Sequence, residues 1–317
     1  MQQATALVEL EGINGDWFTL SGEGMGEQGV YLGTDVDNIY DPPVKTLYTE
    51  HAFQEGATFA GQRVLRRDLV MGLWVTDDNG ELVQENDSRL RKALSYEKEF
   101  KLWITDPERG SRRHLKLRLS EQPQVKMEND PRLLGRMKVV LTCTAGDPWW
   151  YEADYTDTFT STVAVGAGTF TSGTVMVSNP TDHEVYPEWI LGMGAGGAKV
   201  GCIPRLPDFS WGDKRHNGFG TNGYFDAAAV FASRLIVMAE VLPNYPVRVE
   251  TRPDAKLGGY QSLDQTYRQR MKMVRFLYPI PAYTKPTPLP VSISKAAAGT
   301  SIQLRIPRPW SRPWGLE

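Results

Sequence analysis

The stretch Arg67-Asp-Leu-Val-Met-Gly-Leu-Trp-Val75 places an apolar side chain at every second position from Leu69 to Val75. Residues two apart lie on the same face of a β-strand, so this pattern predicts a strand with one buried face. The same alternation recurs before and after it, in residues 7–13, 16–20, 100–104, 114–119 and 137–143. The first half of the chain is therefore predicted to be a β domain, and the fold as a whole to be mainly β.

One segment of the first half departs from this pattern. In residues 86–99, Leu90, Ala93 and Leu94 recur at helical spacing, and the polar residues 86–88 supply a candidate N-cap. We therefore expect one short helix packed against the sheet.

The composition changes after residue 151. Residues 156–174 are rich in Thr, Ser and Gly and alternate only weakly, which indicates a linker that leads into a second β domain. Short apolar runs separated by Gly and Pro turns follow, as is typical of a β sandwich. We expect a domain in 1–155, a sandwich in 156–290, and a last strand with a C-terminal arm in 291–317.

The arm is rich in proline and tryptophan. Residues 279–317 hold 8 of the 21 prolines, and two tryptophans, Trp310 and Trp314, lie near the end. Proline excludes a helix or a central strand, so the backbone is expected to be extended, with the two indoles in separate pockets roughly 12 Å apart. Two hosts for the arm remain open at this point: the sandwich of its own subunit, or a neighbouring subunit.

The charge distribution argues against a nucleic-acid-binding protein. The net charge is −3 and the pI is about 5.9, so no global basic field is present, and no specific nucleic-acid binding is expected. A local basic cluster lies in the first domain, and we interpret it as a contact with another subunit or another protein. The cluster consists of Arg109, Arg112, Arg113 and Lys116. The most apolar segment, 227–242, is interrupted by charged residues, so no membrane insertion is expected.

Motifs for catalysis or cofactor binding are weak. Residues 192–197 match G-x-G-x-x-G, but the residues after them do not form a helical pattern, which the dinucleotide fingerprint requires. The four histidines are isolated from one another and from both cysteines, so no zinc spacing exists. Cys143 and Cys202 fall in different predicted domains, which favours free thiols and synthesis in a cytoplasm. We therefore predict no enzymatic activity, no cofactor and no metal.

A long loop in the second domain carries aromatic side chains. Residues 207–226 are rich in Gly, Asn and Asp and contain Phe209, Trp211, Phe219 and Tyr224. These rings are candidates for a carbohydrate-facing surface, because long loops without periodicity are often functional. The alternative interpretation is that they cover the end of the sandwich core.

Several motifs, taken in order along the chain, resemble the distal tail (Dit-like) and minor tail proteins of long-tailed bacteriophages, particularly those that infect actinobacteria. The motifs are Gly29-Val-Tyr-Leu-Gly33, Tyr40-Asp-Pro-Pro-Val44, Arg66-Arg-Asp-Leu69, Gly146-Asp-Pro-Trp-Trp-Tyr151, the range 177–189, and the closing Ile306-Pro-Arg-Pro-Trp-Ser-Arg-Pro-Trp-Gly315. The arm is a departure, because shorter members of the broader family need not have it.

The resemblance implies an N-terminal belt domain that forms a hexameric ring at the tail end, and a galectin-like or carbohydrate-binding-like sandwich. It also implies a structural role at the virion tail tip, where the ring joins the tail tube to the tail-tip hub and receptor-binding proteins. The expected partners are copies of the chain, the tail tube protein, the tape measure protein, and the hub or other minor tail proteins. The alternative function is a cell-wall carbohydrate-binding or hydrolytic sandwich protein.

Overall fold

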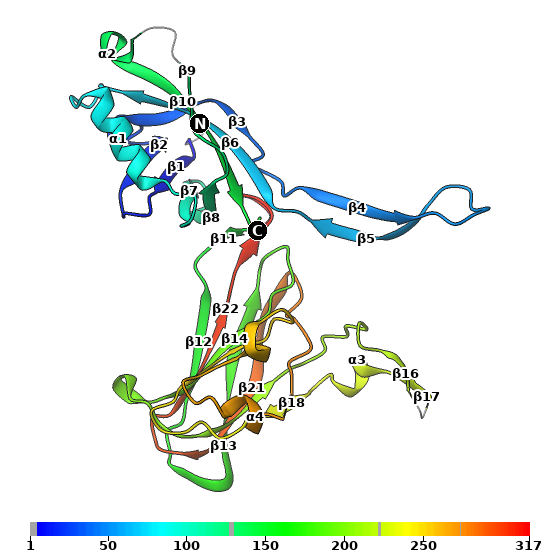
Figure 1. Ribbon diagram of the computed structural model, residues 1–317. Coiled ribbons are helices and arrows are strands. Elements are labelled where there is room, and N and C mark those ends of the chain that lie inside the picture. Colours follow the sequence, from blue (N-terminus) through cyan, green and yellow to red (C-terminus); the bar gives the residue numbers. More distant parts are fainter. Residues whose placement is uncertain (1–4, 127–129, 221–222, 273) are drawn as a thin grey trace. The chain divides into compact units, whose positions relative to one another are not determined.

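The chain folds into two compact units that are interleaved in sequence. The computed structural model describes residues 5–126, 130–220, 223–272 and 274–317 (Figure 1). Unit 1 comprises the chain up to Glu152 together with Pro309–Leu316, and unit 2 comprises Ala153–Arg308 and Glu317. The C-terminal arm is thus part of unit 1, although it follows all of the sequence of unit 2 except Glu317. The predicted mainly β fold is confirmed.

The strands of unit 1 are joined by antiparallel hydrogen-bonded pairs. Ten of them are β1 (Leu7–Glu11), β2 (Trp17–Ser21), β3 (Val30–Asp37), β6 (Arg67–Thr76), β7 (Phe100–Asp106), β8 (Ser111–Leu119), β9 (Gln124–Lys126), β10 (Arg136–Ala145), β11 (Trp150–Tyr151) and β23 (Pro309–Trp310). Their order is β2-β1-β7-β8-β10-β6-β3, with β9 beside β10, β11 beside β8, and β23 beside β11. The alternation in the sequence becomes alternate burial along each strand, and the buried faces share one core.

The helix of unit 1 differs from its predicted bounds. Helix α1 runs from Val83 to Ala93, and its buried residues join the unit 1 core. It begins earlier than predicted because Glu85 accepts a hydrogen bond from the Leu82 backbone N–H, so the first turn is capped from within the helix. It ends before Leu94, which is extended. A second short helix, α2 (Pro131–Leu134), lies before β10.

Asn86 of α1 is buried, and its side chain contacts the last residue of β6. Its Nδ2 donates to the Thr76 carbonyl oxygen at 2.7 Å. Gly29 approaches it closely: a Cβ at this position would lie 2.1 Å from Nδ2 of Asn86, and φ is +70°. Only glycine fits there.

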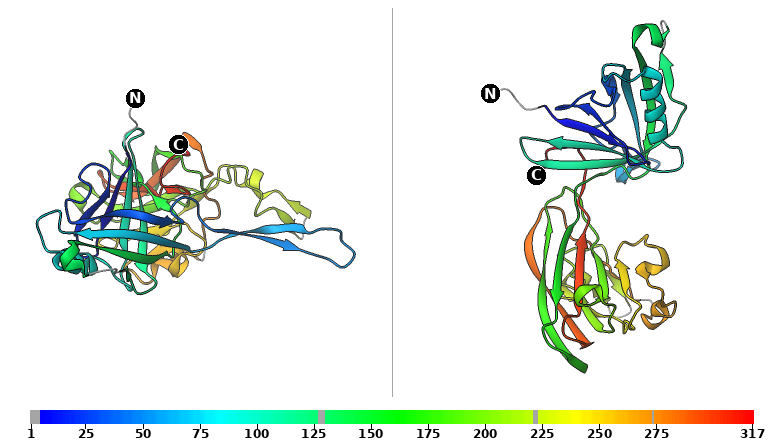
Figure 2. Two further views of the ribbon diagram at one scale, coloured as in Figure 1. Left: turned by 90° about the horizontal axis from the view of Figure 1, so that it is seen from above. Right: turned by 90° about the vertical axis from the view of Figure 1, so that its left-hand side faces the viewer.

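A long hairpin, β4 (Val44–Thr49) and β5 (Thr58–Val64), projects from the rest of unit 1, as Figure 1 and the left view of Figure 2 show. The two strands pair only with each other among the described residues, and every residue of β4 is exposed. No strand was predicted for this segment, because a hairpin with no buried face has no alternation of buried apolar side chains.

Unit 2 consists of two sheets that enclose a second core. The five-stranded sheet is ordered β12 (Tyr155–Thr160), β22 (Ser301–Ile306), β14 (Glu188–Met193), β19 (Val247–Glu250) and β20 (Tyr260–Gln261). The four-stranded sheet is ordered β13 (Val165–Asn179), β21 (Thr284–Ala296), β15 (Ile203–Pro207) and β18 (Leu235–Val237). Both sheets contribute to one cluster of buried side chains, which is the arrangement of a β sandwich.

Shorter elements complete unit 2. A two-stranded hairpin, β16 (Gly218–Gly220) and β17 (Gly223–Phe225), is followed by helix α3 (Ala227–Val230), and helix α4 spans Tyr267–Arg270. Within the described residues, no helix combines the length and the apolar character needed to cross a bilayer.

Two sequence expectations for unit 2 are corrected. Residues 156–174, predicted to be a linker, form most of β12 and the first part of β13. Their backbone pairs with β22 and β21, and their many threonines favour a strand. The proline-rich residues 286–290 lie within β21, a strand with neighbours on both sides. They are tolerated there because β15 pairs only with residues 292–294, so the proline-bearing part of β21 has a partner on one side only.

Candidate interaction surfaces

The C-terminal arm is docked on unit 1 of its own chain. Strand β23 pairs with β11 so that Trp310 lies opposite Trp150, and both indoles are almost completely buried in the unit 1 core. The sequence left the sandwich or a neighbouring subunit as hosts. The structure gives a third host, because the strand that receives the arm lies just before the chain enters unit 2.

Arg113 binds the arm through both its guanidinium plane and its N–H groups. Its guanidinium carbon lies 3.9 Å from the centroid of the Trp310 ring, and Nη1 donates to the carbonyl oxygens of Arg312 at 2.9 Å and Gly315 at 3.0 Å. Nε donates to Glu152 at 3.2 Å, which supplies the balancing charge. Arg113 is fully buried, so it acts inside the subunit.

A second buried arginine, Arg67, links the arm to residues 39–40. Arg67 Nη1 donates to the carbonyl oxygens of Ile39 at 2.7 Å and Tyr40 at 3.0 Å, and Nη2 donates to that of Ser311 at 3.0 Å. Desolvation lowers the pKa of Arg67 to about 10, partly offset by the nearby Asp41 carboxylate. Sequence reasoning missed this role, although Arg67 lies in one of the motifs that carry the family resemblance.

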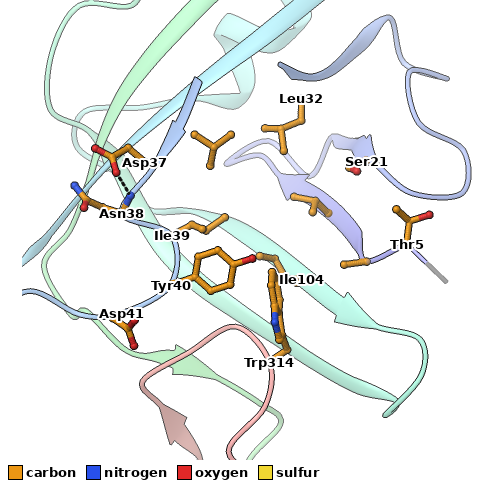
Figure 3. A pocket seen from close by; sticks show the side chains of 13 residues that line it. Thr5, Ser21, Leu32, Asp37, Asn38, Ile39, Tyr40, Asp41, Ile104 and Trp314 are labelled. Atoms are coloured by element: carbon orange, nitrogen blue, oxygen red, sulfur yellow. Dashed lines mark hydrogen bonds between the residues drawn. The ribbon is translucent and has the colours of Figure 1, made fainter. Parts of the chain in front are cut away.

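Trp314 forms one wall of a pocket of about 580 Å³ (Figure 3). Its ring meets Tyr40 edge-to-face with the centroids 4.8 Å apart, and Arg312 pairs with Asp41 at 2.6 Å beside it. The acidic side chain of Asp37 also lines the pocket. The remaining lining is largely apolar and includes Ala6, Val8, Leu32, Val36, Ile39 and Ile104.

Unit 1 carries a ladder of aromatic rings on the solvent side of its sheet. The rings come from β2, β7, β8 and β11, with centroids 6.1 Å apart for Trp17 and Trp103, 4.5 Å for Trp103 and His114, and 6.2 Å for His114 and Tyr151. Each ring is only partly covered, and Trp17 is 41% exposed. We call this ladder, together with the cations Lys101, Arg112 and Lys116, the aromatic face.

The cations of the aromatic face lie over its rings. Arg112 is 4.8 Å from the Trp103 centroid, and Lys116 is 5.8 Å from that of Tyr151. Arg112 pairs with Glu9 at 3.1 Å, and Lys101 pairs with Glu11 at 3.0 Å. Lys116 has no carboxylate partner within the part of the chain that the structure describes.

Two titratable groups of this face are shifted from their ordinary values. The pKa of His114 is lowered to about 4, first by burial and then by the charges of Lys101 and Lys116, so the imidazole is neutral at pH 7. Burial alone would raise the pKa of Glu11, but hydrogen bonds from Trp103 and Lys101 lower it overall. The face therefore presents cations and neutral rings with its two carboxylates already engaged.

The predicted basic cluster does not form a single surface. Arg112 and Lys116 lie on the aromatic face, whereas Arg113 points to the opposite side of β8 and is buried. Adjacent residues of a strand point to opposite faces, so 112 and 113 cannot share one contact. Arg109 lies in the turn between β7 and β8 and is exposed.

The four aromatic residues of the unit 2 loop also divide into two groups. Phe209 and Trp211 pack against the unit 2 core, with ring centroids 6.4 Å apart. Phe219 and Tyr224 lie on the β16–β17 hairpin, where their rings meet at 5.5 Å and are 89% and 60% exposed. Asp208 fixes the base of the loop: it is buried and accepts hydrogen bonds from Arg234 and two backbone N–H groups, while burial raises its pKa.

Candidate catalytic chemistry is sparse. Residues 192–197 end a strand and lead into a 3₁₀ turn and then extended backbone, so no helix N-terminus lies there for a pyrophosphate. In the described ranges, no group of three His, Cys, Asp or Glu side chains is arranged to hold a metal ion. Cys143 and Cys202 are buried free thiols, and burial raises the pKa of each to about 12.

Comparison with known proteins decides the family. No protein-family model matches the chain. The minor tail proteins Gp27 of Mycobacterium phages D29 and L5 are each 32% identical to it, over 98% of this chain and 98% of theirs. The chain belongs to this minor tail protein family. Membership agrees with the prediction of a structural tail protein without enzymatic activity.

A solved structure shows the same fold. The chain is similar to the crystal structure of the Dit (gp 19.1) protein of phage SPP1, with a TM-score of 0.52 and 12% identity, over 96% of this chain and 99% of that one. At this identity the likeness concerns the fold alone. The resemblance to distal tail and minor tail proteins that the sequence motifs indicated is confirmed.

Proposed function

We propose that the chain is a distal tail protein that assembles into a ring, in the form of a hexamer, at the tip of a phage tail. Support comes from full-length membership in the minor tail protein family and from the fold shared with a Dit protein. In this role the ring joins the tail tube to the tail-tip hub and receptor-binding proteins, and its neighbours include the tape measure protein. The subunit is made in the host cytoplasm before assembly.

The observation that carries self-assembly is the β4–β5 hairpin. Its aromatic side chains lie outside any core: Tyr48 and Phe59 stack edge-to-face at 5.9 Å, and they are 57% and 59% exposed. An isolated two-stranded hairpin is marginally stable in water, so a long projecting one needs a partner surface. A surface on a second copy, repeated around an axis, generates a closed ring.

Size-exclusion chromatography with light scattering, followed by negative-stain imaging, tests this proposal. We expect rings or a mass that rises with concentration. The double variant Tyr48→Ser/Phe59→Ser should remain monomeric with an unchanged melting temperature, because these side chains stabilise no core of their own subunit. Leu133→Ser, which alters another exposed apolar side chain of unit 1, is the matched control. A full-length chain that stays monomeric at every concentration would contradict the proposal.

One observation favours a second candidate function, cell-wall carbohydrate binding by unit 2. The exposed ring pair Phe219 and Tyr224 is the kind of surface on which sugars stack. Sedimentation with host cell-wall polysaccharide tests this function. Phe219→Ala should abolish co-sedimentation. Val230→Ala, which changes an exposed apolar residue of the neighbouring helix α3, should not. Release of reducing ends from the polysaccharide would instead reveal a hydrolytic protein.

A further inference from the structure

The aromatic face contains an electrostatic conflict that its own subunit does not resolve. Lys101 and Lys116 are directly opposite each other on β7 and β8, and like charges in this position destabilise a sheet. Glu11 neutralises Lys101, but Lys116 retains only the ring of Tyr151. A carboxylate supplied by another molecule would relieve this repulsion, and the residues beside that carboxylate would cover the partly exposed rings.

The tip of the β4–β5 hairpin has the complementary chemistry. Residues 50–56 contain Glu50, Glu55 and Phe53, and no lysine or arginine. Phe53 is completely exposed, and neither glutamate has an ion-pair partner among the residues that the structure describes. An acidic and aromatic tip thus matches a cationic and aromatic face.

The tip cannot reach the aromatic face of its own subunit. The strands β4 and β5 are paired from Val44–Val64 to Thr49–Thr58, which holds them extended for roughly 20 Å at the rise of a strand. The hairpin projects away from the rest of unit 1 along this length (Figures 1 and 2). The pocket beside Trp314 is a poorer host, because Asp37 lines it and would repel the glutamates.

We propose that the acidic hairpin tip of one copy docks on the aromatic face of the next copy, with Phe53 against the rings and a glutamate beside Lys116. This inference rests on the proposed self-assembly and names the two surfaces that carry it. The contact is heterologous: each subunit offers one tip and one face, and the two are different parts of its surface. Such a contact leaves no unused partner only when the copies close into a ring.

Charge reversal tests the pairing. Lys116→Glu, and separately Glu50→Lys/Glu55→Lys, should each weaken self-association measured by analytical ultracentrifugation at least about tenfold. The combined variant should recover most of the affinity, because the attraction is restored with reversed signs. Lys92→Glu and Glu121→Lys, at exposed positions of unit 1 outside the face, should leave self-association unchanged. Recovery that fails while both single reversals weaken association would overturn the pairing.

Cross-linking identifies the contact directly. A Phe53→Cys subunit mixed with a Lys116→Cys subunit should give a covalent dimer with a short bismaleimide, since Cys143 and Cys202 are buried. A chain that oligomerises without this cross-link refutes the docking mode but leaves the ring proposal standing. A chain that neither oligomerises nor cross-links refutes both. Tight, salt-sensitive binding of a fluorescent DNA duplex that Lys116→Glu abolishes would show that the face serves nucleic acid instead.

Discussion

Replacing Trp310 by alanine tests whether the arm belongs to the core of unit 1. The indole is 1% exposed, its residue pairs with Trp150 across the two strands, and its ring lies 3.9 Å from the Arg113 guanidinium carbon. Tryptophan-to-alanine changes in cores cost about 3–5 kcal/mol, and here Arg113 also loses the ring that covers it. In a unit of about 160 residues, each kcal/mol lowers the melting temperature by roughly 2–4 °C. We therefore expect the unit 1 transition to move down by about 10 °C.

Differential scanning calorimetry of the full-length chain measures this shift. Trp189→Ala, an equally buried indole in unit 2, should lower the other transition and so identify each peak. Trp314→Ala should have a smaller effect than Trp310→Ala, because that ring is only partly buried. The reasoning fails if Trp310→Ala leaves both transitions in place. A loss that appears only at high protein concentration would mean that the arm is supplied by another copy.

Three further changes have defined outcomes. Gly29→Ala should destabilise unit 1 by at least about 2 kcal/mol in urea unfolding, because its Cβ would collide with Asn86 at a positive φ. Asp208→Ala should destabilise unit 2 by about 2–4 kcal/mol, because Arg234 and two backbone N–H groups lose their shared acceptor. The pKa of His114 is lowered from 6.5 to about 4, so the unfolded chain takes up a proton in this window that the folded chain does not. Stability should therefore fall as the pH decreases from 6.5 to 4, by about 1–2 kcal/mol after allowance for the ring's partial exposure, and His114→Gln should remove that dependence.

Each of these three predictions has a control or an outcome that would contradict it. Gly56→Ala alters a glycine of similar φ with open space around it, so it should cost less than Gly29→Ala, and an equal cost would remove the role of Asn86. Asp208→Ala should lower only the melting temperature of unit 2, and a lower melting temperature of unit 1 would contradict the assignment of Asp208 to the unit 2 core. For His114, a stability that is flat between pH 4 and 6.5 would mean that the imidazole is free to protonate in the fold.

Sequence patterns predicted the elements whose residues have one buried face. The range 67–75 was identifiable because its apolar side chains alternate, and it forms β6. Helix α1 was predicted with both bounds wrong: it begins at Val83, with its cap from Glu85 rather than from residues 86–88, and it ends at Ala93 rather than at residue 99. The β4–β5 hairpin was not predictable in this way, because β4 has no buried face and therefore no alternation of buried apolar side chains.

The host of the arm was hidden for a different reason. Trp150 and Trp310 are neighbours in space but 160 positions apart, and no local pattern encodes such a pairing. The basic cluster was predicted from spacing without strand geometry. Residues 112 and 113 point to opposite faces of β8, so Arg113 is buried, whereas Arg109, Arg112 and Lys116 are exposed. Family motifs marked Arg67 as notable without revealing that it donates hydrogen bonds to four backbone carbonyl groups.

The return of residues 309–316 to unit 1 also sets a schedule for synthesis. A ribosome makes most of unit 1 first and then nearly all of unit 2. Only afterwards does it make residues 309–316, which bind Arg113. The domain begun first is thus finished last, and until then it lacks a strand and a buried indole. A chain that stops before residue 309 would therefore leave unit 1 without its last strand and without the buried Trp310 indole.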